Sequence, residues 1–290
     1  MYENILIPTD GSKGAEGGVE HGLRIARRYD ATVHTLFVVE PVYPTADFED
    51  FTTNWNTIKE AFRDQGERVT EEVADRVDEH GLKAVTSVQE GSPHGVILDY
   101  ADENDIDLIA MGTHGRTGLR RYLMGSVTER VIRSSEVPVL AAKAPKEDDR
   151  KGDYNNVLIP TDGSRGVERA IEHGLNIADE FDANLHALYV IDTDIVNWST
   201  LLDTFSEEGE VATKEIEKRA ASFNMGTTTE VVEGTPHEEI LDYIKKKNID
   251  LVVMGTHGRS GLDRLFIGSV TSKVVRSSEV PVLTVRMVED

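Results

Sequence analysis

Two loops in this sequence carry the same arrangement of glycines and a hydroxyl residue. The first reads GTHGRTGLRRYLMGS (112–126), and the second reads GTHGRSGLDRLFIGS (255–269). In each loop two glycines are separated by two residues, and nine further residues precede a Gly-Ser pair. Glycine permits positive φ and close approach of the backbone to a ligand, and free amides at a helix start attract anions. The pattern predicts a phosphate-binding loop in two copies.

Residues beside these loops could bind the remainder of a nucleotide. The hydroxyls of Ser126 and Thr128 could donate hydrogen bonds to phosphate oxygens. Asp10 and Asp162 end the first predicted strand of each half, where a carboxylate could accept bonds from ribose hydroxyls or hold magnesium. Each feature also has a purely structural interpretation, because glycine pairs form turns and Asp10 could cap a helix. The joint placement of carboxylate, glycine loop and Gly-Ser helix start at one sheet edge favours a ligand.

The chain is a tandem repeat. NILIPTDGS recurs 152 residues later as NVLIPTDGS, and SSEVPVL recurs 143 residues after its first occurrence. The first copy therefore holds nine extra residues, between its second and third predicted strands. The charged segment KEDDRKGD at 146–153 is the predicted linker, which separates a domain at 1–145 from a domain at 154–290.

Short apolar runs alternate with amphipathic segments in both copies. In the first copy, the runs ILIPTD, TVHTLFVVE, KAVTSVQE, IDLIAMG and VPVLAAK are predicted strands. Helices are predicted at about 12–29, 57–80, 93–104 and 125–134, with Ser12 and Ser126 at N-caps and Pro93 in a first turn. This order predicts an α/β fold of two tandem repeats, each an open, Rossmann-like parallel sheet with helices on both faces. Ligands in such sheets bind beyond the carboxyl ends of the strands, where the strand order reverses.

Composition excludes several classes of function. The chain has 290 residues, no cysteine and a formal net charge of −22. It therefore has no disulfide, thiolate metal site or cysteine nucleophile, and its charge disfavours nucleic acid and anionic membranes. The N-terminus lacks a secretory pattern, so we expect a cytoplasmic protein. The acidity fits either simple solubility or adaptation to a salty cytoplasm.

Both copies resemble universal stress protein domains. The nucleotide-binding branch of that family carries the spacing glycine, two residues, glycine, nine residues, glycine, then serine or threonine, which both copies match in full. The motifs IPTDGS, EGxPH and VPVL also match, over nearly the whole chain. The resemblance implies five parallel strands and one ATP site per domain, with or without Mg²⁺. The implied site residues are Asp10, Val38, Met111, Gly112, Gly115, Gly125 and Ser126, and then Asp162, Val190, Met254, Gly255, Gly258, Gly268 and Ser269.

The family commonly dimerises through its terminal strand. The resemblance therefore implies an internal pseudo-dimer, in which VPVLAAK lies beside VPVLTVR, and a further homo-oligomer remains open. An exposed apolar edge strand is a liability that the second copy can cover.

Three functions are compatible with these residues. The first is an adenine-nucleotide-binding stress or signalling protein without catalysis. The second is a slow ATPase or autokinase, against which stands the lack of a convincing general base or catalytic lysine. The third is an interaction scaffold that binds no nucleotide. No metal site is expected, because the recurring histidine pairs lack a compact helical spacing. These pairs are His21/His173, His34/His186, His94/His237 and His114/His257.

Overall fold

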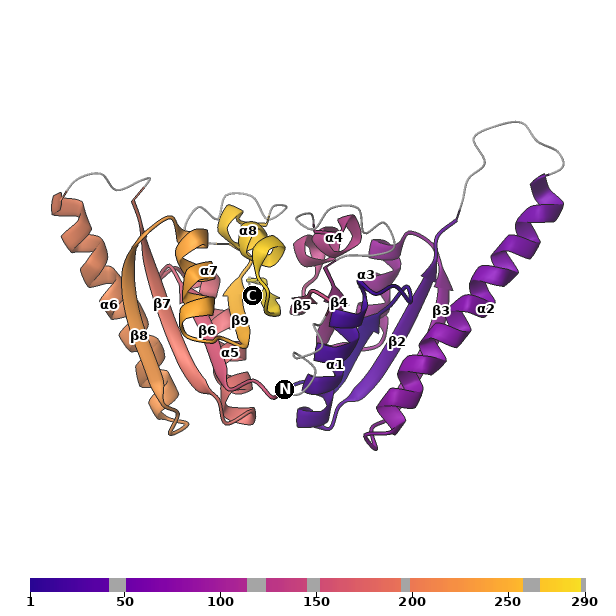
Figure 1. Ribbon diagram of the computed structural model, residues 1–290, viewed down its shortest axis with the longest axis horizontal. Coiled ribbons are helices and arrows are strands. Elements are labelled where there is room, and N and C mark those ends of the chain that lie inside the picture. The colour runs from indigo at the N-terminus through magenta and orange to yellow at the C-terminus, as the bar shows by residue number, and fades with distance from the viewer. Residues whose placement is uncertain (42–50, 114–123, 145–151, 194–198, 258–266, 288–290) are drawn as a thin grey trace. The chain divides into compact units, whose positions relative to one another are not determined.

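The chain forms two compact units (Figure 1). The computed structural model describes residues 1–41, 51–113, 124–144, 152–193, 199–257 and 267–287. The first unit comprises 1–121, 125–131 and 142–146, and the second comprises 122–124, 132–141 and 147–290. The last strand of the first repeat thus belongs almost entirely to the second unit. The domain limits 1–145 and 154–290 remain a prediction.

Four parallel strands form the sheet of the first unit. They are β1 (Asn4–Pro8), β2 (Thr32–Val39), β3 (Ala84–Glu90) and β4 (Leu108–Gly112). The strand order is β3-β2-β1-β4. All of β4 and nearly all of β1 are buried, as expected for parallel strands covered on both faces. Because β2 and β4 flank β1 on opposite sides, the strand order reverses between β1 and β4.

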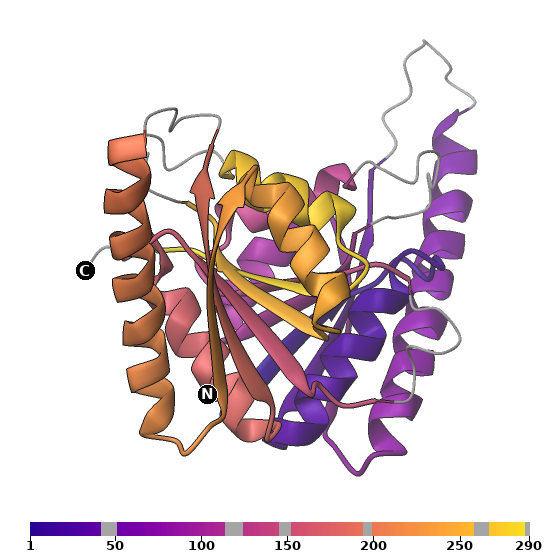
Figure 2. The same cartoon turned by 60° about the vertical axis from the view of Figure 1, so that its left-hand side comes forward.

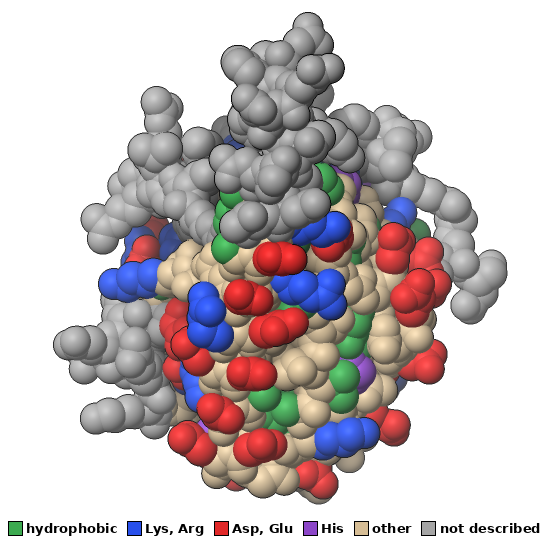
Figure 3. All heavy atoms as spheres, turned by 90° about the vertical axis from the view of Figure 1, so that its right-hand side faces the viewer, with side chains coloured by type: hydrophobic (Ala, Val, Ile, Leu, Met, Phe, Trp, Pro, Cys, Tyr) green, Lys and Arg blue, Asp and Glu red, His purple; other side chains and the backbone are tan. Residues whose placement is uncertain are grey.

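Helices cover both faces of this sheet. They are α1 (Glu16–Tyr29), α2 (Phe51–Asp78), α3 (Pro93–Glu103) and α4 (Ser126–Ser134). Helix α1 contacts β1 and β4, α2 contacts β2 and β3, and α3 contacts β2. Right-handed crossovers place α1 and α2 on one face and α3 on the other, because the chain reverses direction across the sheet after β3. Figure 3 shows red carboxylates with interspersed blue basic groups on the face of α2.

Two expected helix starts differ in the structure. Helix α1 begins at Glu16 instead of residue 12, because Gly11 adopts a φ of 73° and the following residues form a turn. The Ala15 amide donates to the Ser12 carbonyl at 3.0 Å, so Ser12 closes this turn and is not the N-cap. Helix α4 begins at Ser126, which therefore is its first helical residue. Pro93 lies in the first turn of α3, as predicted.

The second unit repeats this architecture and adds one strand. Its own strands are β6 (Asn156–Thr161), β7 (Asn184–Asp192), β8 (Thr227–Gly234), β9 (Leu251–Gly255) and β10 (Val282–Val285). Strand β5 (Val139–Ala142) pairs antiparallel with β10, with Leu140 opposite Leu283. The order is β5-β10-β9-β6-β7-β8. The predicted pairing of VPVLAAK with VPVLTVR is confirmed.

Helices also cover both faces of the second sheet. They are the short 3₁₀ helix η2 (Arg165–Val167), then α5 (Glu168–Glu180), α6 (Ser199–Ala221), α7 (Pro236–Lys246) and α8 (Ser269–Ser277). Helix α5 contacts α6, and α7 contacts α8, on opposite faces of the strands (Figure 2). The predicted α/β fold of two tandem repeats is confirmed. No helix in the described ranges is long and apolar enough to span a membrane.

One buried polar pair is built identically in both units. The His34 ring nitrogen Nδ1 lies 3.0 Å from the Tyr100 hydroxyl, and that of His186 lies 3.1 Å from the Tyr243 hydroxyl. Burial lowers the pKa of both histidines and raises the pKa of Tyr243 to about 12. These histidines are therefore neutral core residues that join the sheet to the helix after β3 or β8.

Candidate nucleotide site

A cavity of about 460 Å³ opens in the first unit at the carboxyl ends of β1, β2 and β4. It lies where the strand order reverses, which is the expected ligand position in an open parallel sheet. Its volume is within the range of small-molecule pockets. Six residues implied by the family resemblance line it together, namely Asp10, Val38, Met111, Gly112, Gly125 and Ser126.

The aspartate after β1 has a structural role and also faces the cavity. Asp10 Oδ1 accepts a hydrogen bond from the Ser12 amide at 2.9 Å. In the second unit, Asp162 Oδ1 accepts one from the Ser164 amide at 3.0 Å. Asp10 therefore holds a turn and does not cap α1, and its residue also lines the cavity. A carboxylate held in this way can accept hydrogen bonds from sugar hydroxyls.

The glycines that end β4 and β9 are required by space and not by φ. Neither Gly112 nor Gly255 adopts a positive φ, which corrects the expected reason for Gly112. A Cβ atom at Gly112 would overlap the Gly14 carbonyl oxygen, and one at Gly255 would lie 2.8 Å from the Gly166 carbonyl oxygen. The turn after the first strand of each repeat therefore rests directly on the backbone of the glycine that ends β4 or β9.

Two groups expected to bind phosphate are committed to other partners. Thr128 Oγ1 donates to the Gly112 carbonyl at 2.7 Å, and the Gly125 amide donates to the Thr113 carbonyl at 2.7 Å. The Thr128 hydroxyl therefore joins α4 to the end of β4 and is not a phosphate donor. Ser126 is exposed at the first position of α4, where the positive end of the helix dipole favours an anion.

The same bonds recur in the second repeat. Thr271 Oγ1 donates to the Gly255 carbonyl at 2.8 Å, and the Gly268 amide donates to the Thr256 carbonyl at 2.8 Å. Gly268 is the N-cap of α8, and Ser269 follows as its first residue. The ends of β6 and β9 are therefore arranged as in the first repeat, with Asp162 at one and Gly255 at the other.

The other predicted site residues lie on strands of the second unit or outside the described residues. Val190 is half-buried in β7, and Met254 is buried in β9. Gly115, Gly258 and the histidine at 114 lie outside the described residues.

Several cavity residues were not singled out from the sequence. Phe62 from α2 and Ile97 from α3 supply apolar walls, and Glu40 after β2 adds a second carboxylate. Ile97 could have been recognised as an inward-facing position of its helix, since Tyr100 and Ala101 are buried on the same side. Phe62 could have been recognised from the repeat, since Phe205 lies 143 residues later, at the offset that relates Gly66 to Gly209. Walls of this kind suit a planar aromatic base.

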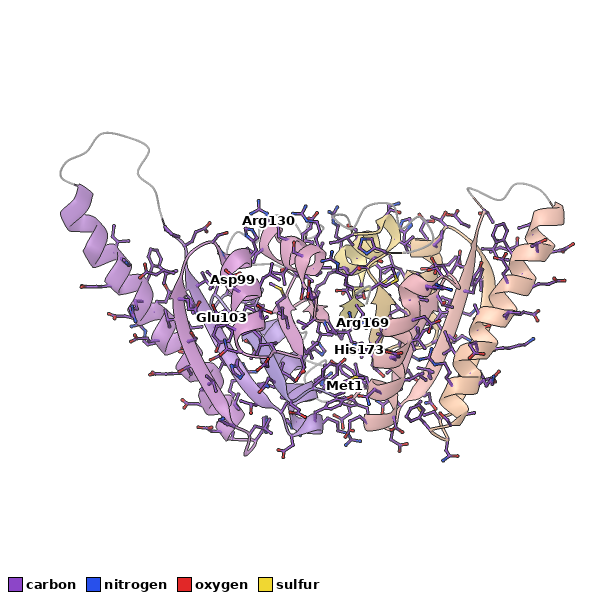
Figure 4. All side chains as sticks on the ribbon, turned by 180° about the vertical axis from the view of Figure 1, so that it is seen from behind. Met1, Asp99, Glu103, Arg130, Arg169 and His173 are labelled. Atoms are coloured by element: carbon purple, nitrogen blue, oxygen red, sulfur yellow. The ribbon has the colours of Figure 1, made fainter. Side chains whose placement is uncertain are left out.

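His21 is buried on α1, and its counterpart His173 is half-buried on α5. Burial, together with nearby Arg24, lowers the pKa of His21 to about 3. Burial and nearby Arg169 lower the pKa of His173 to about 4. Arg169 and His173 are both on α5, one turn apart (Figure 4). Neither histidine lines the cavity of the first unit. In the described part of the chain, no group of three His, Asp or Glu side chains could hold a metal ion.

Comparisons with known proteins agree with this architecture. A family model described as the universal stress protein family matches residues 1–143 and again residues 153–286. A universal stress protein from Methanocaldococcus jannaschii is 39% identical over 140 residues, which are 46% of this chain and 82% of that protein. One from Mycolicibacterium smegmatis is 27% identical over 293 residues, covering 97% of this chain and 96% of its own length.

A solved structure is similar to the chain over nearly its whole length. The crystal structure of a universal stress protein from Archaeoglobus fulgidus matches with a TM-score of 0.73 at 25% identity, covering 98% of both chains. Two α/β repeats, with a cavity at the point of strand reversal of the first unit, define the class of protein, and the chain belongs to the universal stress protein family. Its two family matches make it a tandem form with two such domains.

Proposed function

We propose that this protein binds adenine nucleotides, with one ATP site in each repeat, and acts as a non-catalytic stress-response or signalling protein of the cytoplasm. The observation that carries the proposal is the cavity of the first unit, which brings a carboxylate, two glycines and the start of α4 to one place. The base would lie against Val38 and Ile97. The ribose hydroxyls would bind Asp10, and the phosphates would lie at Ser126, with or without Mg²⁺.

The second site is proposed from repeated geometry. The hydrogen bonds that hold Asp162, Gly255 and Gly268 match those of the first repeat. ATP would then stabilise both units, and the two domains would act as an internal pair in place of two separate chains.

Catalysis is not part of the proposal. An ATPase or autokinase needs a positioned base or nucleophile, and the described lining of the first cavity offers only Asp10 and Glu40 as titratable groups. The Asp10 carboxylate already accepts a hydrogen bond from the Ser12 amide. ATP turnover no faster than the spontaneous rate is the expected result, and product formation that depends on Asp10 would favour the enzyme.

The test is titration calorimetry of nucleotide-free protein with ATP. The wild type should bind two equivalents. Ser126→Asp should reduce this number to one, because its carboxylate repels phosphate while favouring the helix start. Ser269→Asp should remove the other equivalent. The controls Ser126→Asn and Ser269→Asn have nearly the same size without charge, and they should retain two. No binding by the wild type would leave the interaction scaffold as the function.

A further inference from the structure

A groove of about 830 Å³ lies between α5 and α6 of the second unit, and one end of it is lined by Thr161, Gly163 and Ser164 of the turn that holds Asp162. One stripe of α6 lines it, at the three- and four-residue spacing of a single helix face. The stripe includes Thr204, Glu208, Val211, Ala212 and Glu215. With Ile216 at its far end, it spans about 18 Å of helix at 1.5 Å per residue.

The centre of the groove is apolar. Val167 before α5 and Ile171 within it are buried at its side. Val211 is 69% exposed and is the most exposed large hydrophobic side chain among the described residues. A valine of this kind beside a groove offers apolar surface that a partner could remove from water.

The rim of the groove is acidic. Glu168 from α5 and Glu207, Glu208 and Glu215 from α6 line it, and the lining contains no lysine or arginine. All four glutamates are exposed. Arg219 neutralises part of this charge through its bond to Glu168 at 2.8 Å, and Lys218 lies 4.0 Å from Glu215. The rim remains acidic on balance, which favours a cationic partner.

The first unit keeps most of the acidic rim at the matching positions, with Glu16, Asp64 and Glu72, but it does not have the exposed valine. Gly66 in α2 and Gly209 in α6 align, because each rests against the aromatic ring at the same position of the neighbouring strand. Arg68 and Val69 therefore stand where α6 has Val211 and Ala212.

The valine fills the space that the alanine leaves open. A Cβ atom at Gly11 would lie 2.8 Å from Val69 Cγ2, whereas one at Gly163 would lie 3.5 Å from Ala212 Cβ. The first repeat thus covers its turn with a larger side chain and carries a positive charge where the second repeat carries an exposed valine.

We propose that the groove of the second unit binds a basic amphipathic helix of about three turns from another protein. Its apolar face would cover Val211 and Ala212, and its lysines or arginines would pair with Glu208 and Glu215. The length of the α6 stripe favours a helix over a small cation, because helices in grooves bind through anchors repeated over several turns. The proposal does not depend on nucleotide binding.

The test is fluorescence anisotropy of the full chain with two labelled peptides at physiological salt. The first carries leucines at helical spacing among lysines, and the second is a scrambled peptide of the same composition without an apolar face. The amphipathic peptide should bind at least about tenfold more tightly than the scrambled one. Equal affinities would overturn the proposal, since attraction to an acidic protein alone does not require amphipathicity.

Variants distinguish the groove from the overall charge. The double variant Val211→Arg/Ala212→Val introduces the residues of the first unit and should weaken binding by about tenfold or more. Glu215→Gln should weaken it by about threefold, in the range of one exposed ion pair. Its counterpart Glu72→Gln makes the same charge change on α2 and should have no effect. An unaffected double variant, or equal effects of the two Glu→Gln variants, would refute the site.

Discussion

Replacing Gly18 by alanine should destabilise the first unit, because α1 packs closely on the backbone of β4 at this glycine. A Cβ atom at Gly18 would lie 2.5 Å from Met111 Cα and 2.7 Å from the Gly112 amide nitrogen. Both are backbone atoms of a buried strand, so no side chain can rotate away. The corresponding residue of the second repeat is Ala170, so the close approach is a property of the first repeat.

The expected size combines two opposing effects. Alanine favours a helix over glycine by about 1 kcal/mol. Overpacking of a core costs about 1 to 3 kcal/mol, and immobile backbone neighbours place this site at or above the upper end. The net loss for Gly18→Ala should be about 2 kcal/mol, which lowers the melting temperature of a unit of this size by roughly 4 to 8 °C. Because Met111 and Gly112 line the cavity, ATP affinity at the first site should fall as well.

The matched control is Gly95→Ala in α3, where an added Cβ would meet nothing within 4 Å. This variant should be neutral or stabilising by up to about 1 kcal/mol. Urea denaturation of the full chain measures both changes, and hydrogen exchange at the amides of β4 assigns the loss to the first unit. If Gly18→Ala stabilised the protein as Gly95→Ala does, the close packing of α1 on β4 would be refuted.

Three further outcomes are expected. The melting temperature should rise between low and molar potassium chloride, because salt screens the repulsion between carboxylates. Carboxylates outnumber basic groups by 28 to 17 in residues 1–150 and by 25 to 14 in the rest. A flat or falling melting temperature would contradict salt adaptation. The pKa of His21 is lowered to about 3 in the folded protein, against about 6.5 in the unfolded chain. The free energy of unfolding should therefore fall as pH drops from about 6.5 towards 3, by up to about 1.4 kcal/mol per pH unit, because the unfolded chain binds the proton first. Urea denaturation at several pH values should show a weaker dependence on pH for His21→Gln. Arg76→Ala should lower the free energy of unfolding by about 1 to 2 kcal/mol, more than Arg219→Ala does. Arg76 binds two glutamates of α1 at 2.9 and 2.6 Å whose side chains are 32% and 22% exposed, whereas the partners of Arg219 are 56% and 59% exposed. Equal shifts of the denaturation midpoint in the two variants would argue against this.

The order and type of the elements followed from the sequence because alternation of apolar strands and amphipathic helices is a strong local signal. The start of α1 did not follow, because Gly11 uses a left-handed conformation that a helical pattern does not reveal. The sequence also did not explain why Gly17 and Gly18 of the first repeat are replaced by Arg169 and Ala170 in the second. The structure supplies the reason, because a Cβ at Gly17 would overlap the Lys143 carbonyl, whereas Arg169 donates to the Arg286 carbonyl at 2.8 Å.

The site was predictable at the level of strand ends and loops, but not at the level of individual donors. Asp10 and Gly112 line one cavity as their positions at predicted strand ends suggested, and Met111 lines it as the family resemblance implied. Thr128 was misinterpreted because a hydroxyl two residues into a helix can bind either a ligand or a nearby carbonyl, and only the tertiary structure shows that Gly112 accepts its proton.

The pairing of β5 with β10 has a consequence for how the chain emerges from the ribosome. Thr284 Oγ1 donates to the Val139 carbonyl at 3.0 Å across 145 residues of sequence. At about 5 to 20 residues per second, roughly 7 to 30 s pass between synthesis of β5 and synthesis of its partner. During this time the nascent chain exposes an apolar strand edge that could pair with another copy on the same messenger. The second repeat thus completes a sheet that the first repeat leaves open while translation continues.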